Sequence, residues 1–263
     1  MKIKMLCFIL VLLVTGSMGT IHASANDQKV KELDIGDSFD GAEGTMVLQN
    51  LKNDKVFIYN KQRSKVRYTP ESTFKVANAL IGLQTKAVSD EYEVKRWDGV
   101  IREFEDWNRD HTLASAMRHS VIWYYQAMAR DIGAENMQQY VNLLDYGNRD
   151  ISSGIDQFWL DSSIKISARE QVQFMEKLVE EKLPIDKQHM RTVKRIMINE
   201  EADSYVLHGK TGTRLSDMGL GWYVGYIETD KGEWAFATNM DGSGSKAKTI
   251  TLEALKELDI MEE

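Results

Sequence analysis

Cysteine is almost absent from this chain: its 263 residues include one, Cys7, which lies in an apolar run near the N-terminus. Beyond that run there is no thiol, which excludes a disulfide framework, a cysteine-ligated metal and a cysteine nucleophile from the rest of the protein. Histidine is scarce as well. The four histidines past residue 25 lack the spacing of a motif such as His-Glu-x-x-His; they are His111, His119, His189 and His208. We therefore expect no metal cofactor.

Proline is rare, and positive charge is not in excess. The two prolines, Pro70 and Pro184, leave the middle of the chain free for long helices, and no repeat or low-complexity linker divides it. The formal net charge of −7 argues against a nucleic-acid partner. A chain of this length buries one full core, so we expect a single domain over residues 26–263.

The only long apolar run lies at the N-terminus. Lys2 and Lys4 precede the run from Met5 to Val14, and the small residues Ala23-Ser24-Ala25 follow it. This pattern is typical of a secretory signal peptide over residues 1–25, and it predicts a secreted, extracytoplasmic protein. The alternative is an uncleaved signal that acts as an anchor. No other stretch has the ~18 apolar residues needed to span a bilayer, so we expect no obligate membrane partner.

Strand patterns occupy both ends of the chain and helical patterns its middle. Thr45–Leu48 and Val56–Tyr59 flank a polar turn and predict an N-terminal hairpin. Strand patterns return at 205–207, 221–226 and 234–238. A closing helix is predicted over 251–258. We predict an α/β fold of the α+β type, with one antiparallel sheet flanked by helices. The sheet is built from about 26–71 and 200–263, with an all-helical lobe of about 72–199 inserted.

The most informative stretch is Ser72-Thr73-Phe74-Lys75, which places a hydroxyl and an amine three residues apart. Thr69 and Pro70 suit the N-cap and the first position of a helix, so a helix is predicted to begin here. The spacing then puts Ser72 and Lys75 on one face, where the amine is able to take the hydroxyl proton. The apolar run Val76–Leu83 predicts a buried helix, and burial favours the neutral, basic form of Lys75.

The spacing by itself does not decide the function. It recurs at three pairs in polar, turn-rich surroundings where solvated surface is expected, namely Ser162/Lys165, Ser243/Lys246 and Ser245/Lys248. On local sequence alone, an ordinary serine beside a lysine that extends to solvent remains an alternative for Ser72 and Lys75. The rest of the chain has to discriminate between the two interpretations.

Further motifs add chemistry. Lys210-Thr211-Gly212 follows a predicted strand, and its glycine lets the strand edge approach a ligand closely. Lys210 and Thr211 offer a cation and a hydroxyl to an anionic substrate. Ser120-Val121-Ile122 supplies a second hydroxyl, and Tyr146-Gly147-Asn148 reads as a turn after a helix. Trp159, considered alone, is typical of a core aromatic residue.

Taken together and in this order, these motifs resemble the motif set of class D serine β-lactamases, within the penicillin-binding Ser-x-x-Lys superfamily. The similarity covers the whole chain past the signal, including the segments 146–166 and 221–241. The resemblance implies a β-lactamase/transpeptidase-like fold and a single catalytic domain. It implies hydrolysis of the β-lactam ring of penicillin-type antibiotics, and hence antibiotic resistance.

The resemblance also implies residue roles. Ser72 is the nucleophile that becomes acylated, and Lys75 is the general base, modified by carbon dioxide to N6-carboxylysine. Only an uncharged amine reacts with carbon dioxide, which explains why this lysine has to be buried. Trp159 holds the carbamate through its indole N–H. Ser120 passes a proton to the departing lactam nitrogen.

Further roles concern substrate binding. Lys210 and Thr211 orient the substrate carboxylate and Ser120, and Gly212 lines the site. The backbone N–H groups of Ser72 and Thr213 form the oxyanion hole. The motif Tyr146, Gly147 and Asn148 shapes a neighbouring loop. The resemblance implies no cofactor besides carbon dioxide or bicarbonate.

Two positions depart from the family pattern. Ile122 stands where the family usually has valine, which adds one methylene to an apolar wall and predicts a changed pocket shape. The family commonly has an arginine before the C-terminal helix that binds the substrate carboxylate, and Ala247 occupies that place here. Lys246, Lys248 and Arg214 are candidates to replace it, and we assign Lys246 to the substrate site, although a lysine lacks the bidentate grip of an arginine.

Two other functions stay open at this point. A penicillin-sensor domain shares the fold and nearly all the motifs, but it keeps the drug and signals; it is normally joined to a membrane transducer. A D-Ala-D-Ala peptidase of the same fold turns over peptide rather than lactam. The sequence does not predict the oligomeric state or the substrate spectrum.

Overall fold

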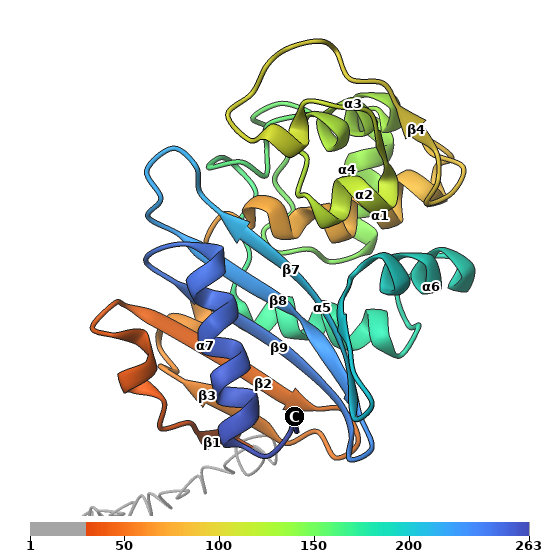
Figure 1. Cartoon of the computed structure of the whole chain (residues 1–263). Coiled ribbons are helices and arrows are strands. Elements are labelled where there is room, and N and C mark those ends of the chain that lie inside the picture. Colours follow the sequence, from red (N-terminus) through yellow and green to blue (C-terminus); the bar gives the residue numbers. More distant parts are fainter. Residues whose placement is uncertain (1–29, 263) are drawn as a thin grey trace, which may run out of the picture.

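The computed structural model describes residues 30–262 and is built around a seven-stranded sheet (Figure 1). Its strands lie in the order β1-β3-β2-β9-β8-β7-β6. They comprise β1 (Val30–Glu32), β2 (Gly44–Asn50), β3 (Val56–Tyr59), β6 (Ile198–Glu201), β7 (Tyr205–Thr213), β8 (Gly221–Thr229) and β9 (Gly232–Met240). Neighbouring strands are antiparallel, apart from β1 and β3, which run parallel.

The two ends of the chain meet in the middle of this sheet. β2 pairs with β9 from Gly44↔Met240 to Asn50↔Trp234, so orange and blue strands lie side by side in Figure 1. β-Branched and aromatic residues predominate in β8, and such side chains favour the pleated, buried backbone of central strands. The sheet therefore forms only when the N-terminal and C-terminal segments come together.

Helices cover both faces of the sheet and form a lobe at one end (Figure 1). They are α1 (Lys75–Gln84), α2 (Leu113–Arg118), α3 (Ile122–Ile132), α4 (Ala134–Leu143), α5 (Ala168–Val179), α6 (Lys187–Ile196) and α7 (Gly244–Glu257). Short 3-10 turns span Gly36–Phe39, Arg63–Lys65, Glu71–Phe74 and Glu105–Trp107. α7 packs on one face and α5 on the other, while α1 to α4 form the lobe together with a small hairpin of β4 (Val94–Lys95) and β5 (His111–Thr112).

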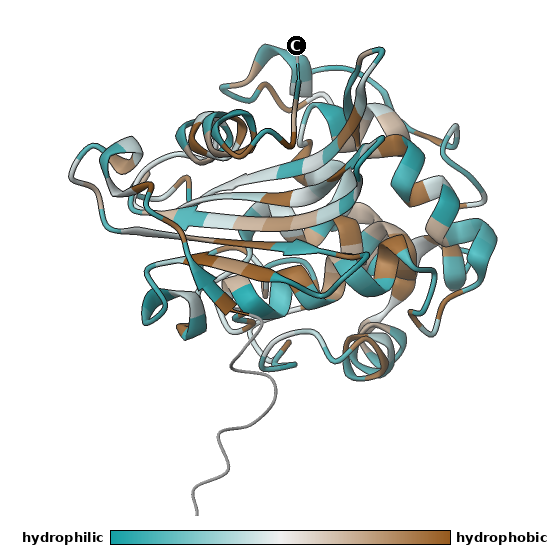
Figure 2. Cartoon of the chain, turned by 90° about the horizontal axis from the view of Figure 1, so that it is seen from below, coloured by the Kyte–Doolittle hydropathy of each residue, from teal (hydrophilic) through white to brown (hydrophobic). Residues whose placement is uncertain are grey.

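The core has two parts, one on each side of the sheet. The larger part joins the sheet to the lobe and includes Phe74, Leu80 and Trp222. The smaller part lies under α7 and includes Tyr223 and Ile250. Figure 2 shows apolar positions concentrated between the sheet and the helices, with hydrophilic positions facing outward. The C-terminal end of β7 is the part of the sheet that lies next to the lobe. A site formed by both the sheet and the lobe is expected there.

The predicted architecture is confirmed, with corrections in detail. The sheet does combine both ends of the chain, but α5 lies within the range 72–199 and packs on the sheet because its buried side faces β2, β8 and β9. The lobe is not all helical, since it includes β4 and β5. The edge strand β6 was missed because all four of its residues are exposed, which removes the alternating pattern of a half-buried strand. The closing helix begins at Gly244, earlier than predicted.

The predicted signal peptide, residues 1–25, lies outside the described residues. Within residues 30–262, no helix combines the length and the apolar character needed to span a membrane.

Candidate active site

Ser72 lies in the 3-10 turn Glu71–Phe74, which leads directly into α1. A 3-10 turn places residues three apart above one another, and here the Lys75 amine donates a hydrogen bond to the Ser72 hydroxyl oxygen at 2.8 Å. The predicted helix cap is wrong: the Thr69 hydroxyl donates instead to the Glu71 carboxylate at 2.6 Å. The structure nevertheless brings Ser72 and Lys75 into the predicted contact.

Lys75 is completely buried, and its surroundings favour the neutral amine. Burial lowers the pKa of Lys75 well below its ordinary value, the positive charge of Lys210 lowers it further, and the charge of Glu71 opposes the shift. The amine also lies 5.5 Å from the centre of the Tyr125 ring. A neutral amine in contact with a serine hydroxyl is suited to removing its proton.

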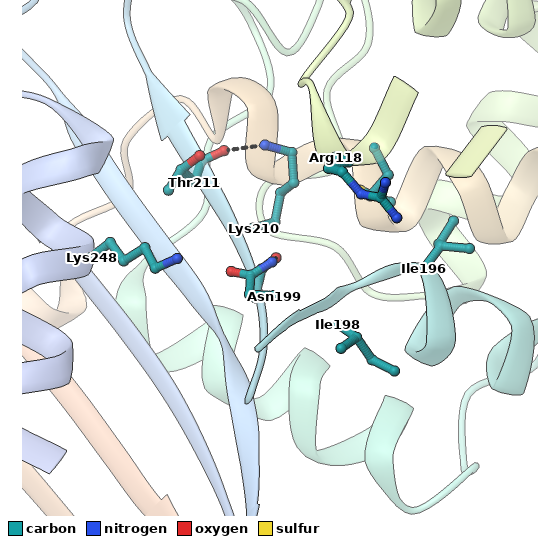
Figure 3. A pocket seen from close by; sticks show the side chains of 9 residues that line it. Arg118, Ile196, Ile198, Asn199, Lys210, Thr211 and Lys248 are labelled. Carbon is teal, nitrogen blue, oxygen red and sulfur yellow. Dashed lines mark hydrogen bonds between the residues drawn. The ribbon is translucent and has the colours of Figure 1, made fainter. Parts of the chain in front are cut away.

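Ser120 and Lys210 form a second hydroxyl–amine pair. The Lys210 amine donates to the Ser120 hydroxyl oxygen at 3.0 Å and to the Thr211 carbonyl oxygen at 2.8 Å, the second bond being drawn in Figure 3. Burial lowers the pKa of Lys210 to about 7. Ser120 has a φ of 56°, a left-handed conformation that a serine keeps only where its surroundings fix it. The end of α2 therefore holds its hydroxyl against β7.

The end of β7 has an open edge beside these groups. β6 pairs with β7 only as far as His208, and the Gly209 N–H donates to the Met197 carbonyl at 2.9 Å. Because N–H groups alternate in direction along a strand, those of Thr211 and Thr213 point to the same edge, past the end of β6. Both are directed at the space that a ligand beside Ser72 would occupy.

Gly212 allows β7 to pack against the turn that carries Ser72. A Cβ atom added to Gly212 would lie 3.0 Å from the Pro70 carbonyl oxygen and 3.3 Å from the Ser72 amide nitrogen. The Trp222 indole N–H donates to the Thr69 carbonyl at 3.0 Å and fixes the same turn to the sheet. The backbone N–H groups of Ser72 and of the following β7 segment are thereby brought together.

Trp159 lies beside the residue that precedes Lys75. Its ring stacks on Phe74 with the ring centres 5.6 Å apart. The indole Nε1 is buried and has no hydrogen-bond partner among the described residues. A buried donor without an acceptor costs free energy, so this N–H is suited to an acceptor supplied by a bound group.

The Tyr146-Gly147-Asn148 motif braces the loop after Trp159. Gly147 has a φ of 56°, and a Cβ atom there would lie 2.1 Å from the Lys165 carbonyl oxygen, which excludes any side chain. The Asn148 side chain accepts from the Lys165 N–H and donates to the Ser163 carbonyl, each at 2.9 Å. Tyr146 is buried.

A pocket of about 150 Å³ lies directly in front of Ser72. Five of its lining residues are among those singled out from the sequence: Ser72, Ser120, Ile122, Thr211 and Thr213. Four others were missed: Phe104, Trp107, His119 and Leu215. These residues lie in loops or at the ends of helices, and none of them belongs to a recognisable sequence motif. Phe104 and Leu215 are more than two-fifths exposed, an unusual state for large apolar residues that only the structure reveals.

A second pocket, of about 280 Å³, lies beside Lys210 and Thr211 (Figure 3). Its cationic side chains come from three elements: Arg118 from α2, Lys210 from β7 and Lys248 from α7. The remaining lining residues are Met117, Ile196, Ile198, Asn199, Gly209 and Thr211, so no acidic side chain lines it. In a protein of net charge −7, such a pocket is suited to an anion.

Lys246, assigned to the substrate site from the sequence, lines neither pocket. Its amine lies 3.7 Å from the Asp40 carboxylate. Residues two apart on a helix differ in direction by about 200°, so Lys248 points elsewhere and lines the second pocket. Arg214 is engaged by the Asp217 carboxylate through two hydrogen bonds of 2.8 Å. Of the three candidates, only Lys248 lies next to Lys210.

Comparisons with known proteins identify the family. The model of the penicillin binding protein transpeptidase domain matches residues 41–258. The chain is 56% identical over 263 residues to the probable β-lactamase YbxI of Bacillus subtilis, with 98% of each protein covered. It belongs to the class D β-lactamase family. It is also 42% identical to β-lactamase OXA-48 of Klebsiella pneumoniae, over 84% of this chain and 85% of the relative.

Solved structures of class D β-lactamases have the same fold. The crystal structure of a class D β-lactamase from Bacillus subtilis has a TM-score of 0.86 at 60% identity, covering 88% of this chain and 98% of the other. A class D enzyme from Nostoc has a TM-score of 0.84 at 34% identity, covering 87% and 100%. The family and the fold predicted from the motifs are confirmed.

Two of the histidines that the structure describes, His111 and His208, belong to hydrogen-bond networks and packing. His111 contacts the Ser115 hydroxyl and the Asp106 carbonyl, and His208 stacks on Tyr226. Within residues 30–262, no three or more histidine, cysteine, aspartate or glutamate side chains are grouped so as to hold a metal ion.

Proposed function

We propose that this protein hydrolyses the β-lactam ring of penicillin-type antibiotics through an acyl-enzyme on Ser72, and so confers antibiotic resistance. The observation that carries the proposal is the 2.8 Å hydrogen bond between Ser72 and the buried Lys75. It supplies a nucleophile and a base in a chain whose relatives are named β-lactamases. No separate metal or organic cofactor is needed for this chemistry.

Acylation would use five residues: Ser72, Lys75, Ser120, Lys210 and Thr213. The base at Lys75 takes the Ser72 proton while the hydroxyl oxygen attacks the lactam carbonyl carbon. The backbone N–H groups of Ser72 and Thr213 stabilise the negative charge that develops on the carbonyl oxygen. As the C–N bond breaks, Ser120 donates its proton to the leaving nitrogen, and Lys210, at 3.0 Å, is able to replace that proton. The product is an ester of Ser72.

Deacylation needs a base that activates water. The residues present fit an N-carboxylated Lys75, because the amine is buried and favoured in its neutral form and the Trp159 indole N–H lacks an acceptor. When carbon dioxide is bound there, it provides an oxygen base for both catalytic steps. Trp159 would donate to it, and the apolar surroundings, with Phe74 and Ile122 among them, exclude bulk water. This modification belongs to the proposal.

The substrate carboxylate would be held by the pocket of Figure 3. Lys210 is the cation nearest to Ser120, and Thr211 adds a hydroxyl on the same strand. Lys248, which lines the same pocket from α7, would replace the arginine that is missing at Ala247. In front of Ser72, the apolar side chains of Ile122 and Leu215 would contact the rest of the drug.

We also propose that residues 1–25 direct export and are removed, which would place the enzyme where these drugs act. The support is the pattern of a charged start, an apolar run and small residues.

The test is steady-state hydrolysis of a chromogenic cephalosporin and a penicillin, together with intact-mass measurement. A β-lactamase turns over many equivalents, and free enzyme returns once the drug is consumed. An adduct that persists for hours with no turnover would identify a penicillin sensor. Turnover of a D-Ala-D-Ala peptide in place of lactam would identify a peptidase.

A further inference from the structure

Glu71, the residue before the nucleophile, is a buried carboxyl group that the steps above do not use. It is 2% exposed, and its φ of 52° lies in the left-handed region, where a non-glycine residue is strained. Such strain persists only where the surrounding structure fixes it. The side chain and backbone of Glu71 form the contacts that do so.

These contacts join segments that are far apart in sequence. The Glu71 carboxylate oxygen Oε1 accepts from the Thr69 hydroxyl at 2.6 Å and from the Asp161 N–H at 2.9 Å. The Glu71 N–H donates to the Trp159 carbonyl at 3.0 Å. One residue thus connects the turn that carries Ser72 to both ends of the short segment Trp159–Asp161.

The connection extends to the sheet and to the loop after β7. Thr69 accepts a hydrogen bond from the Trp222 indole on β8, as described above. The Asp161 carboxylate accepts from the Ser216 hydroxyl at 3.0 Å, and the Arg214 guanidinium lies 3.7 Å from it. Glu71 is therefore at the junction of the nucleophile turn, the Trp159 segment and the β7–β8 loop.

We propose that Glu71 is a positioning residue for deacylation: its two accepted hydrogen bonds hold the Trp159–Asp161 segment in register with Ser72 and Lys75. The inference rests on the proposed function. Trp159 is fixed through its carbonyl and through the following residues, so the direction of its indole N–H depends on this connection. Removing the acceptor leaves the Asp161 N–H without this partner and frees the segment to move.

Two substitutions separate hydrogen bonding from charge. Glu71→Gln keeps an oxygen acceptor of the same reach, whereas Glu71→Ala removes it. We expect Glu71→Ala to slow deacylation about tenfold or more, the effect of losing a hydrogen bond to a charged group. Acylation should slow less, so acyl-enzyme accumulates and both kcat and KM fall. Glu71→Gln should keep kcat within about twofold of the unsubstituted enzyme.

The negative charge of Glu71 should have a separate effect, on the pH dependence of kcat/KM. The charged groups that face it are Asp161, Arg214 and Lys75. Since the negative charge of Glu71 raises the pKa of Lys75, Glu71→Gln should move the acid limb of the kcat/KM profile to lower pH. A purely structural role would lower stability without moving this limb.

The experiment measures acylation and deacylation separately by stopped-flow and quenched intact-mass methods, with thermal unfolding of each variant. Glu176→Ala is the control, since Glu176 is a partly buried carboxyl group on α5, with a hydrogen bond to Gln49 and outside the Ser72 pocket. Slow deacylation in Glu71→Ala, rescue in Glu71→Gln and normal kinetics in Glu176→Ala support the proposal. Equal deacylation rates in all three would overturn it. Absence of turnover in the unsubstituted protein would instead count against the proposed function.

Discussion

Gly212 faces Ser72 across the junction of sheet and lobe: a Cβ atom on Gly212 would lie 3.3 Å from the Ser72 amide nitrogen. The same atom would lie 3.1 Å from the Thr73 methyl group and 3.0 Å from the Pro70 carbonyl oxygen. These neighbours are mostly backbone, which yields less readily than the end of a flexible side chain. The separation of β7 from the nucleophile turn is therefore fixed by the absence of a single methyl group.

Gly212→Ala should impair catalysis more than stability. Moving β7 away by a few tenths of an ångström separates the Thr213 N–H from that of Ser72, which weakens the oxyanion hole. We expect a loss in kcat/KM approaching the about 100-fold that follows removal of one oxyanion donor. Kinetics combined with thermal unfolding checks this, and Gly232→Ala, at a hairpin turn far from Ser72 in sequence, shows the effect of a strained glycine site alone.

Ser72→Ala should abolish acylation while leaving the fold intact. The substitution removes one hydroxyl that is bonded only to Lys75 among the described residues, so the packing of α1 is preserved. Intact-mass and peptide mapping after exposure to penicillin should find the adduct at Ser72 in the unsubstituted protein and no adduct in the variant. An adduct that maps to Ser120 or another residue would refute the assignment.

Trp159→Phe should slow deacylation through loss of one N–H. Phenylalanine keeps the stacking on Phe74 but removes the buried donor. If Lys75 works as a carbamate, activity falls on degassing and recovers with bicarbonate, and added bicarbonate restores part of the rate of Trp159→Phe. Labelled bicarbonate followed by carbon-13 NMR checks the species directly. A degassed enzyme that stays fully active would show that the free amine is the base.

Loss of the positive charge of Lys210 should raise KM as the pH rises through neutrality. Burial lowers the pKa of Lys210 to about 7, so its amine loses charge as the pH rises through that value. Binding of a carboxylate substrate then weakens, and KM rises between pH 6 and pH 8 without an equal change in kcat. Lys210→Ala should lower kcat/KM by about 10- to 100-fold, the range for a hydrogen bond to a charged group.

Lys248 and Lys246 test the second pocket as a pair. Lys248→Ala should raise KM by a few-fold and reduce the dependence of kcat/KM on salt, because it removes a cation that lines the pocket. Lys246→Ala is the control on the same helix, since its amine faces Asp40. Equal kinetics for the two variants would show that the substrate carboxylate is held elsewhere.

Glu71→Gln should also raise stability at neutral pH. Burial raises the pKa of Glu71 above its ordinary value, so its contribution to stability is present at low pH and is lost as the pH rises through the raised pKa. A glutamine side chain does not ionise, so Glu71→Gln does not lose stability as the pH rises. Its melting temperature should exceed that of the unsubstituted protein at pH 7, with a difference that narrows towards pH 5. A lower melting temperature at pH 7 would show that the charge itself stabilises the fold.

Motif spacing predicted the parts of the site that depend on local geometry. Ser72 and Lys75 share one turn, so the three-residue spacing was enough to predict their contact. The pairing of Ser120 with Lys210 joins residues 90 positions apart, and the resemblance to a family supplied it. The motif order likewise predicted the fold, because the same order belongs to one known arrangement.

Other features depend on tertiary packing and could not be read from the sequence. Lys246 and Lys248 are both lysines near one helix start, and only the direction of α7 relative to the sheet distinguishes them. The buried state of Glu71 contradicts the usual exposure of glutamate. Phe104 and Leu215 reach the pocket from loops, where no periodic pattern signals position.

The pairing of β2 with β9 constrains the order in which the protein is able to fold. β2 pairs with the nearby β3 on one side, but its partner on the other side is β9, so that central pairing waits until residues 232–240 have been synthesised. Contacts between distant segments slow folding, so completion of the sheet waits for the C-terminal segment. The helical lobe has its partners close in sequence, which makes it the part able to gain structure first.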